Sequence, residues 1–254
     1  MSVWPGADAS VRVPVSSTIL PASGKLCLMT FNIRHAKGLD GQVRLSAIRD
    51  QIQQAQADFA ALQEVDRFQW RSGLQDQARV LAKQLGMSYA YAPALRNGLS
   101  EYGIALLSRY PLINIQIYPL AGVREPRAVL AAEAVVKLQD GEQKRLTIVT
   151  THLGVANADR VRQMPELIRI VQSLPAPVVL MGDLNTAPND PLMKELETVL
   201  HKVSLQAPLH STLIRGGEID HIFTSLNPSV TTGAWTEPTR ASDHVPVLHE
   251  ISFP

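Results

Sequence analysis

The sequence predicts a single α/β domain, and three observations support this fold class. Short apolar runs typical of buried strands alternate with segments whose apolar residues recur every three or four positions, as in amphipathic helices. The length of 254 residues is enough for one large hydrophobic core. No repeat, low-complexity linker or charge block divides the chain. We therefore expect one domain over residues 25–254, preceded by an irregular, proline-containing arm over residues 1–24.

The first part of the domain is predicted to alternate strands with helices. The run Leu26–Asn32 is almost wholly apolar, which is typical of a strand buried on both faces. Apolar residues at helical spacing predict a helix over Val43–Ala55, and Phe59–Leu62 predicts a second buried strand. The stretch Asp76–Leu85 predicts a helix that ends at Gly86, because glycine is favoured just after a helix.

The middle of the chain is rich in predicted strands, bounded as Ile104–Leu107, Ile113–Tyr118, Val129–Leu138 and Leu146–His152. The pair Asp140-Gly141 between the last two predicts a hairpin.

Two further helices are expected in the C-terminal half. One covers Asn157–Leu174, where Pro165 should kink the helix or shift its start. The other begins at the pair Asp190-Pro191, which is typical of an N-cap and first helical residue, and extends to about Leu200. Short strands complete the pattern at Val178–Met181, Ile219–Thr224 and Val245–Phe253.

Composition excludes several classes of protein. The chain has 24 Lys and Arg against 23 Asp and Glu, and 45% of its residues are apolar, so disorder, membrane spans and a globally basic nucleic-acid binder are not expected. The single cysteine, Cys27, excludes an intramolecular disulfide and a cysteine-rich zinc site. Residues 1–24 lack the basic start and unbroken apolar run of a signal peptide, so we expect a cytoplasmic monomer.

Polar residues recur where predicted strands end or begin. They are Asn32, Glu64, His152, Asp183, Asn185, Asp220, Asp243 and His244. Strand ends are where α/β folds build sites, because the sheet sets the direction of each side chain while the attached loop gives access. Taken singly, each of these residues has an ordinary structural explanation as a turn, cap or hydrogen-bonded core residue, but their number favours a site.

The residue types indicate the chemistry of that site. Carboxylates and amide carbonyls form a hard oxygen set that suits Mg²⁺ or Mn²⁺ and suits zinc poorly. Two histidines add donors for phosphate oxygens. The sequence has neither the GxSxG motif of serine hydrolases nor the GxxxxGK[ST] loop of nucleotide-binding proteins. Hydrolysis of a phosphoester is therefore favoured over acyl transfer and over nucleotide-driven phosphoryl transfer.

Seven motifs in order resemble the endonuclease/exonuclease/phosphatase superfamily, which includes deoxyribonuclease I. They are MTFNIR from Met29, LQEVD from Leu62, YGIALLSRYPL from Tyr102, THL from Thr151, GDLN from Gly182, IDHIF from Ile219 and SDHVPV from Ser242. The resemblance extends from about Lys25 to Phe253. It implies a four-layer α/β sandwich, in which two packed mixed sheets are flanked by helices and the site lies at one end.

The resemblance also implies a metal centre. Glu64 would hold the divalent ion, Mg²⁺ or Mn²⁺, with Asp243 and Asn32 nearby. Some members of the superfamily fill a second metal site from residues corresponding to Asp183, Asn185 and the last histidine, so one or two ions are expected.

Catalytic roles follow from the same resemblance. Asp183 would position or deprotonate the attacking water, and Asn185 would orient the water or the phosphate. His244 would contact the phosphate, with Asp220 holding its tautomer and favouring its charged form. His152 matches a second phosphate-contacting histidine that could also protonate the leaving group.

The sequence leaves open the role of Arg127 and the class of substrate. Arg127, at the head of a strand, either reaches a substrate phosphate or pairs with Glu125. We expect a phosphodiester of a small molecule or lipid headgroup as substrate. A nuclease, including one of abasic-site type, is the alternative because nucleic acid stays possible, and an inactive binding scaffold is the alternative from another class.

Overall fold

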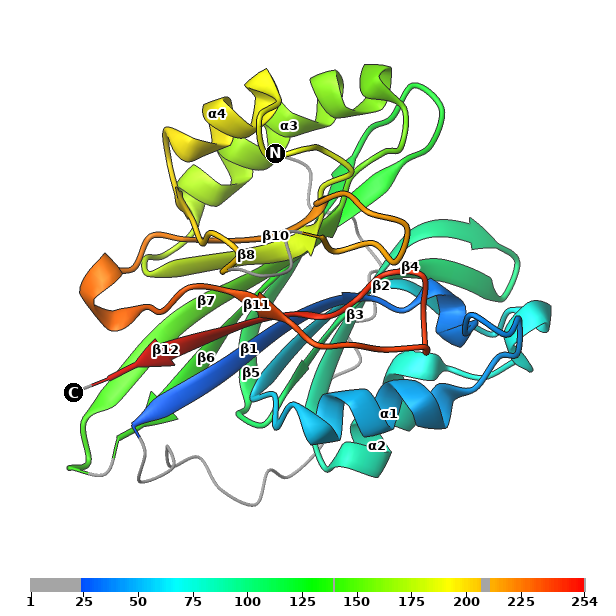
Figure 1. Ribbon diagram of the computed structural model, residues 1–254, viewed down its shortest axis with the longest axis horizontal. Helices are drawn as coiled ribbons and strands as arrows, with labels where there is room; N and C mark the ends of the chain where they lie inside the picture. The colour runs from blue at the N-terminus through cyan, green and yellow to red at the C-terminus, as the bar shows by residue number, and fades with distance from the viewer. Residues whose placement is uncertain (1–23, 139, 207–210, 254) are drawn as a thin grey trace.

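Two mixed β-sheets of six strands each pack face to face, and helices cover both outer faces (Figure 1). The computed structural model describes residues 24–138, 140–206 and 211–253, so the predicted arm lies outside the described residues except for Gly24. This arrangement confirms the predicted four-layer sandwich.

The first sheet has the order β11-β12-β1-β2-β4-β3. Its strands are β1 (Lys25–Asn32), β2 (Phe59–Arg67), β3 (Ser88–Asn97), β4 (Ser100–Ser108), β11 (Trp235–Thr236) and β12 (Val247–Ser252). The helices on its outer face are α1 (Leu45–Gln54) and α2 (Gln77–Leu85). Two short 3₁₀ turns, η1 (Arg34–Ala36) and η2 (Trp70–Ser72), follow β1 and β2.

The second sheet has the order β5-β6-β7-β8-β10-β9. Its strands are β5 (Leu112–Leu120), β6 (Arg127–Lys137), β7 (Gln143–His152), β8 (Val178–Asp183), β9 (His201–Lys202) and β10 (Asp220–Thr224). The helices α3 (Asn157–Ser173) and α4 (Pro191–Glu197) cover its outer face, and a 3₁₀ turn, η3 (Pro228–Val230), precedes β11.

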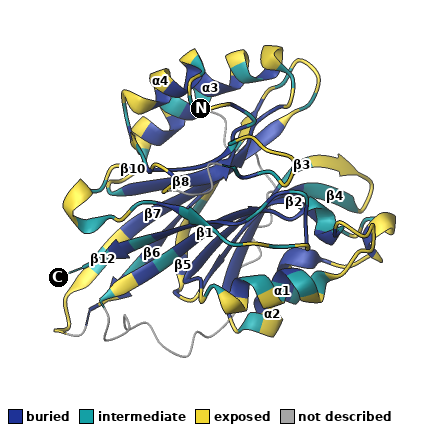
Figure 2. Cartoon of the chain, in the orientation of Figure 1, coloured by how far each residue is buried: buried dark blue, intermediate teal, exposed yellow. Residues whose placement is uncertain are grey.

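Three apolar clusters hold the four layers together. The position of β1 between two of these clusters explains why its sequence is apolar almost throughout. Leu26 and Leu28 face the core between the two sheets, whereas Met29 and Phe31 face the cluster under α1 and α2. Successive side chains of a strand point to opposite faces, so a strand covered on both sides needs both sets to be apolar. Figure 2 shows the resulting band of buried residues through both sheets.

The predicted boundary signals are confirmed. Gly86 follows α2 with a φ of 66°, and the Asp190 side chain accepts a hydrogen bond from the Leu192 amide at the start of α4. The hairpin at Asp140-Gly141 joins β6 to β7, which pair in antiparallel register. α3 begins at Asn157 and continues past Pro165, so the proline does not shift its start.

Two strand predictions need correction. β3 is absent from the predicted elements, because alanines and Pro93 lower the β-propensity of Ser88–Asn97. Its pairing with β4 outweighs that weak local preference. β2 does not end at Leu62 but continues to Arg67 through a bulge. No helix in the described part of the chain is long and apolar enough to cross a membrane.

Candidate active site at one end of the sandwich

The polar residues predicted at strand ends lie at the same end of the two sheets. β1 and β2 are parallel and finish there, as do the parallel pair β7 and β8. β10 and β12 run antiparallel to β8 and β1 and therefore begin there. The pairing register brings His152 and Asp220 directly beside Asp183 on the two neighbouring strands.

Asn32 connects the two sheets. Its Nδ2 donates to Asp183 Oδ2 at 2.9 Å and to Glu64 Oε1 at 3.1 Å, so one amide orients a carboxylate from each sheet. Asn32 and Asp183 are buried, whereas Glu64 is partly exposed. A buried carboxylate needs such partners, because it loses its hydration on folding.

Glu64 owes its direction to the bulge in β2. The register between β2 and β4 shifts between Leu62 and Val65, and Glu64 has a φ of 56°, in the left-handed region that non-glycine residues rarely adopt. Asn185 shares this unusual conformation, with a φ of 49°. Residues held in such conformations cost about 1–3 kcal/mol each and cluster at functional sites. The left-handed conformations of Glu64 and Asn185 therefore support a functional role for both residues.

His244 forms a hydrogen-bonded pair with Asp220. Its Nδ1 lies 2.8 Å from Asp220 Oδ2, and its Nε2 lies 3.9 Å from Asp183 Oδ2. Burial lowers the pKa of His244, but the attraction and hydrogen bond of Asp220, helped by Asp183, outweigh burial and raise it to about 9. The imidazole is therefore charged at neutral pH and directs an N–H toward Asp183.

Asp183 is a buried carboxyl whose surroundings disfavour its charged form. Burial and the neighbouring Asp220 carboxylate raise its pKa, against His244 and the hydrogen bonds from Asn32 and the Asn185 amide. A group poised in this way can accept a proton near neutral pH.

His152 differs from the expected charged imidazole. It is buried, and burial together with Arg127 and His244 keeps its pKa well below the usual value. Asn185 Nδ2 lies 3.1 Å from His152 Nε2 and also donates to Leu153 O at 2.9 Å. In the neutral ring that the lowered pKa favours, His152 Nε2 accepts from the Asn185 amide, although the same Nε2 also lies 3.4 Å from Asp183 Oδ2.

Arg127 was expected either to pair with Glu125 or to bind a substrate phosphate, and its position allows both. Its Nη2 pairs with Glu125 Oε2 at 3.0 Å and the guanidinium also forms a hydrogen bond with the Tyr102 side chain, yet Arg127 is only 3% exposed. Buried guanidinium donors without partners are costly unless an anion completes them. The ion pair and an anion site are therefore compatible.

Asp243 lies at the edge of the site rather than inside it. Its Oδ2 is 3.3 Å from Arg34 Nη1, and its carboxylate is 41% exposed. The neighbouring Ser242, which sequence reasoning did not single out, donates to Asn32 O at 2.8 Å. This bond joins the loop before β12 to the end of β1, so Ser242 sets the distance between Asp243 and the strand ends.

The structure also brings together carboxylate and imidazole atoms that could surround a cation. One atom from each of Asp183, Asp220 and His244 lies within 4.8 Å of the others. Asp220 was expected to orient His244 rather than to bind metal, and its short bond to Nδ1 agrees with that role. Glu64 and Asp243 lie outside this cluster, and both have partly exposed carboxylates.

Two cavities flank the site. One of about 530 Å³ is lined by Glu64, Arg71, Arg96, Tyr102, Glu125 and further polar residues. A second, of about 270 Å³, lies beside Arg34 and Asp243. Arg71 and Arg96 were not predicted as site residues, because arginines on exposed loops carry no sequence signal until the fold places them next to Glu64.

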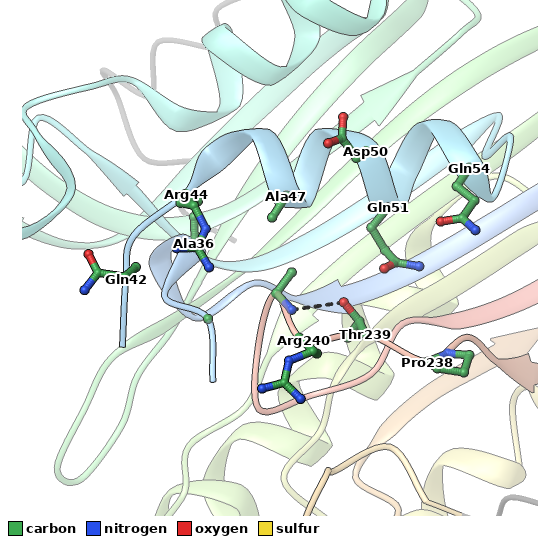
Figure 3. A pocket seen from close by; sticks show the side chains of 12 residues that line it. Ala36, Gln42, Arg44, Ala47, Asp50, Gln51, Gln54, Pro238, Thr239 and Arg240 are labelled. Carbon is green, nitrogen blue, oxygen red and sulfur yellow. Dashed lines mark hydrogen bonds between the residues drawn. The ribbon is translucent and has the colours of Figure 1, made fainter. Parts of the chain in front are cut away.

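A third cavity, of about 450 Å³, lies between α1 and the loop 238–241 (Figure 3). It is lined by Arg44, Gln51 and Arg240 among others, and it contains none of the predicted site residues. We do not assign it to the active site.

Comparison with known proteins places the chain in a family. The model of the Endonuclease/Exonuclease/phosphatase family matches residues 29–244, and the chain belongs to this family. Its members are generally hydrolases that act on phosphoesters and generally use divalent metals. The resemblance seen in the seven sequence motifs is thereby confirmed.

Individual relatives are more distant. A stretch of 149 residues, 57% of this chain, is 32% identical to Protein cwh43 of Schizosaccharomyces pombe but spans only 15% of that protein. The endonuclease/exonuclease/phosphatase from Beutenbergia cavernae has a similar fold, with a TM-score of 0.74 and 21% identity over 90% of this chain and 72% of that chain. The human Nocturnin catalytic domain, solved with a bound sulfate anion, has a TM-score of 0.65 and 21% identity over 91% of this chain and 94% of its own.

Proposed function

We propose that this protein is a divalent-metal-dependent phosphodiesterase whose substrate is a small molecule or a lipid headgroup. The observation that carries the proposal is the convergence of Asn32, Glu64, Asp183 and the His244–Asp220 pair at one end of the sandwich. A charged donor, a carboxyl poised to accept a proton and hard oxygen ligands are the groups that phosphoester hydrolysis requires.

The residues present fit a divalent cation. Glu64 and Asp243 offer partly exposed carboxylates, and Asn32 orients Glu64 toward Asp183. Burial and, after it, the neighbouring Asp220 carboxylate raise the pKa of Asp183, and a bound cation would oppose both effects. We propose Glu64 as the principal ligand of Mg²⁺ or Mn²⁺, with Asp243 and Asn32 beside it, and Asp183 and Asn185 toward a second ion. Such an ion, when bound, stabilises negative charge on the phosphate oxygens.

The remaining steps belong to the chain's own side chains. We assign Asp183 to orient the attacking water and to take its proton. His244 donates its Nε2–H to a phosphate oxygen, while Asp220 holds its Nδ1–H. Asn185 orients the water or the phosphate, and neutral His152 holds Asn185 through its Nε2. In this arrangement His152 is a positioning residue before the reaction, and it contacts the phosphate only if Asn185 releases it.

The cavity beside Glu64 supports the proposed substrate class. Its volume of about 530 Å³ suits a small polar group, and its wall carries charges of both signs, with Arg71 and Arg96 beside Glu64 and Glu125. Arg127 has five N–H donors and two described side-chain partners, Glu125 and Tyr102, and it is assigned to bind phosphate. The human Nocturnin catalytic domain, which has a similar fold, was solved with a bound sulfate anion, an oxyanion like phosphate.

The test is a panel of esters with Mg²⁺ or Mn²⁺, with and without chelator. It includes bis-p-nitrophenyl phosphate, p-nitrophenyl phosphate, sphingomyelin, inositol phosphates, and plasmid and abasic DNA. Hydrolysis of small or lipid diesters supports the proposal. Cleavage of DNA with no activity on small diesters favours the nuclease alternative, and no metal-dependent activity on any ester favours the inactive scaffold.

Site variants test the roles. Asp183→Ala, Glu64→Ala and His244→Ala should each reduce turnover by about 10²–10⁴-fold or more with an unchanged circular dichroism spectrum. Glu195→Ala and His201→Ala remove the same residue types from exposed positions and should leave turnover unchanged. Near-normal activity in any of the three site variants would defeat the assignment of that residue.

A further inference from the structure

Large apolar side chains are exposed mainly at the active-site end. Leu99 on the β3–β4 turn is 87% exposed, and Trp70 in η2 is 83% exposed. The loops around the site carry more of them, and we call the set the apolar rim: Leu39, Val43, Phe68, Trp70, Leu74, Leu95, Leu99, Val123, Val155 and Ile214. Of the large apolar residues exposed within the described ranges, only Ile113 and Val161 lie elsewhere.

The rim is built from segments that are far apart in the sequence. It includes the loops after β1, β2 and β7, the β3–β4 turn, the β5–β6 loop and the loop before β10. The β3–β4 hairpin projects from the body of the molecule in Figure 1, and its end is exposed in Figure 2. Exposed apolar side chains scattered singly are normal, but their concentration around one opening marks an interaction surface.

Arginines accompany the apolar residues. Exposed apolar residues stand directly before exposed arginines in four places, at Trp70-Arg71 in η2, at Leu95-Arg96 near the end of β3, and at Val123-Arg124 and Ile214-Arg215 in loops. Arg44 and Arg240, which line the separate cavity between α1 and the loop 238–241, bring the exposed arginines at this end of the molecule to six, against the exposed Asp40 and the partly exposed Glu64, Glu125 and Asp243. This excess contrasts with the formal net charge of +1 for the chain.

Three of these arginines are available for an external anion. Arg71 pairs with Asp66, Arg96 with Glu101 and Arg44 with Asp40. Arg124, Arg215 and Arg240, on three separate loops, form no ion pair with any described residue. Apolar side chains that enter a lipid layer, flanked by cations at headgroup level, are the two components of interfacial membrane binding.

We propose that the apolar rim docks this protein onto an anionic lipid surface, with the active-site end facing the headgroups. Docking itself needs no turnover. The further step, that the headgroup of a lipid in that surface is the substrate, rests on the proposed function. Aliphatic side chains dominate the rim, whereas single-stranded nucleic acid is bound by stacking on aromatic faces, and Phe68 and Trp70 are the only aromatic residues in this set. The rim therefore fits lipid better than nucleic acid.

The test measures binding to vesicles by sedimentation in the presence of chelator. Wild type should sediment with vesicles of equimolar phosphatidylcholine and phosphatidylserine, and less with phosphatidylcholine alone or at high salt. Trp70→Ala and Leu99→Ser should each weaken binding about tenfold or more, because each removes a large inserted side chain. Ile113→Ser, an exposed apolar residue at the opposite end of β5, is the matched control and should bind as wild type.

Activity on a soluble ester separates this proposal from the proposed function. Trp70 and Leu99 do not line the cavity beside Glu64, so both variants should hydrolyse bis-p-nitrophenyl phosphate at the wild-type rate. Normal vesicle binding without hydrolysis of any diester would refute the proposed function and leave the docking in place.

Four results would overturn the docking itself. One is the absence of wild-type binding to either kind of vesicle. Another is equal loss of binding in the Ile113→Ser control, which would mean that the position of the apolar residue does not matter. The third is a dimer mass in analytical ultracentrifugation that Trp70→Ala or Leu99→Ser reduces to a monomer mass. The fourth is binding of an oligonucleotide that both variants weaken as strongly as they weaken vesicle binding. In either case the apolar rim would bind another partner.

Discussion

A buried histidine far from the active site should make stability depend on pH. His249 on β12 lies opposite Leu28 of β1, and Val247 and Ile251, two residues away on either side, face the core between the sheets. His249 is completely buried, and its hydrogen bond with the backbone of Gly233 does not offset the effect of burial on its pKa. We predict that His249→Leu removes a defined part of the acid sensitivity of the fold.

The size of the effect follows from the pKa. Burial lowers the pKa of His249 from 6.5 to about 4. The unfolded chain therefore binds more protons than the folded chain between these values, so the contribution to stability is complete above about pH 6.5 and decreases as the pH falls toward about 4. At about pH 5 the linkage relation gives a loss of about 2 kcal/mol relative to about pH 7.5, and the full loss below pH 4 is about 3 kcal/mol.

Urea unfolding followed by circular dichroism at about pH 7.5 and about pH 5 measures this difference. The loss of unfolding free energy between the two pH values should be about 2 kcal/mol smaller in His249→Leu than in wild type. At about pH 7.5 the variant should be less stable than wild type by about 1 kcal/mol, because leucine removes the hydrogen bond of His249 with the Gly233 backbone. His201→Ala, which removes an exposed histidine, is the control. Equal losses in wild type and His249→Leu would refute the reasoning.

Three other perturbations test the site and the fold. Chelation should abolish diester hydrolysis without changing the circular dichroism spectrum, and added Mg²⁺ or Mn²⁺ should restore it; full activity in chelator would exclude the proposed metal dependence. Gly182→Ala should destabilise the protein by about 1–3 kcal/mol in urea unfolding, because a Cβ there would lie 2.1 Å from Thr151 O. Wild-type stability would show that β7 and β8 can separate at no cost. Asp76→Ala should cost more than about 1 kcal/mol, because it removes both the cap on the Arg79 amide and the ion pair with Arg67; Asp76→Asn, which keeps the cap and loses the ion pair, should cost less, and equal losses would assign the effect to the ion pair.

Much of the fold could be predicted because local sequence patterns agree with the final packing. Both faces of β1 are covered, so its apolar run is continuous, and α2 and α4 carry the capping residues that their ends require. The local pattern does not predict β3, because its alanines and Pro93 have a low β-propensity. Pairing with β4 supplies the stability of that strand, and pairing is a long-range effect.

The candidate site was predicted from the same strand ends, but its geometry depends on distances across the sandwich. Asn32 and Asp183 are 151 positions apart, and their contact forms only when the two sheets pack. The neutral state of His152 and the charged state of His244 cannot be read from residue type. Burial and the nearest charges determine them, and both depend on packing.

By itself, the sequence determined the fold class, the family and the residue types at the strand ends, because hydrophobic period, capping and motif order are local properties of the chain. Only the tertiary structure decided how Glu64 points, which histidine carries charge, and that Arg71 and Arg96 line a cavity beside Glu64. It also gathered the apolar rim from separate loops around one opening. Side-chain direction, desolvation and surface clustering arise from contacts between segments distant in the sequence, so no local pattern encodes them.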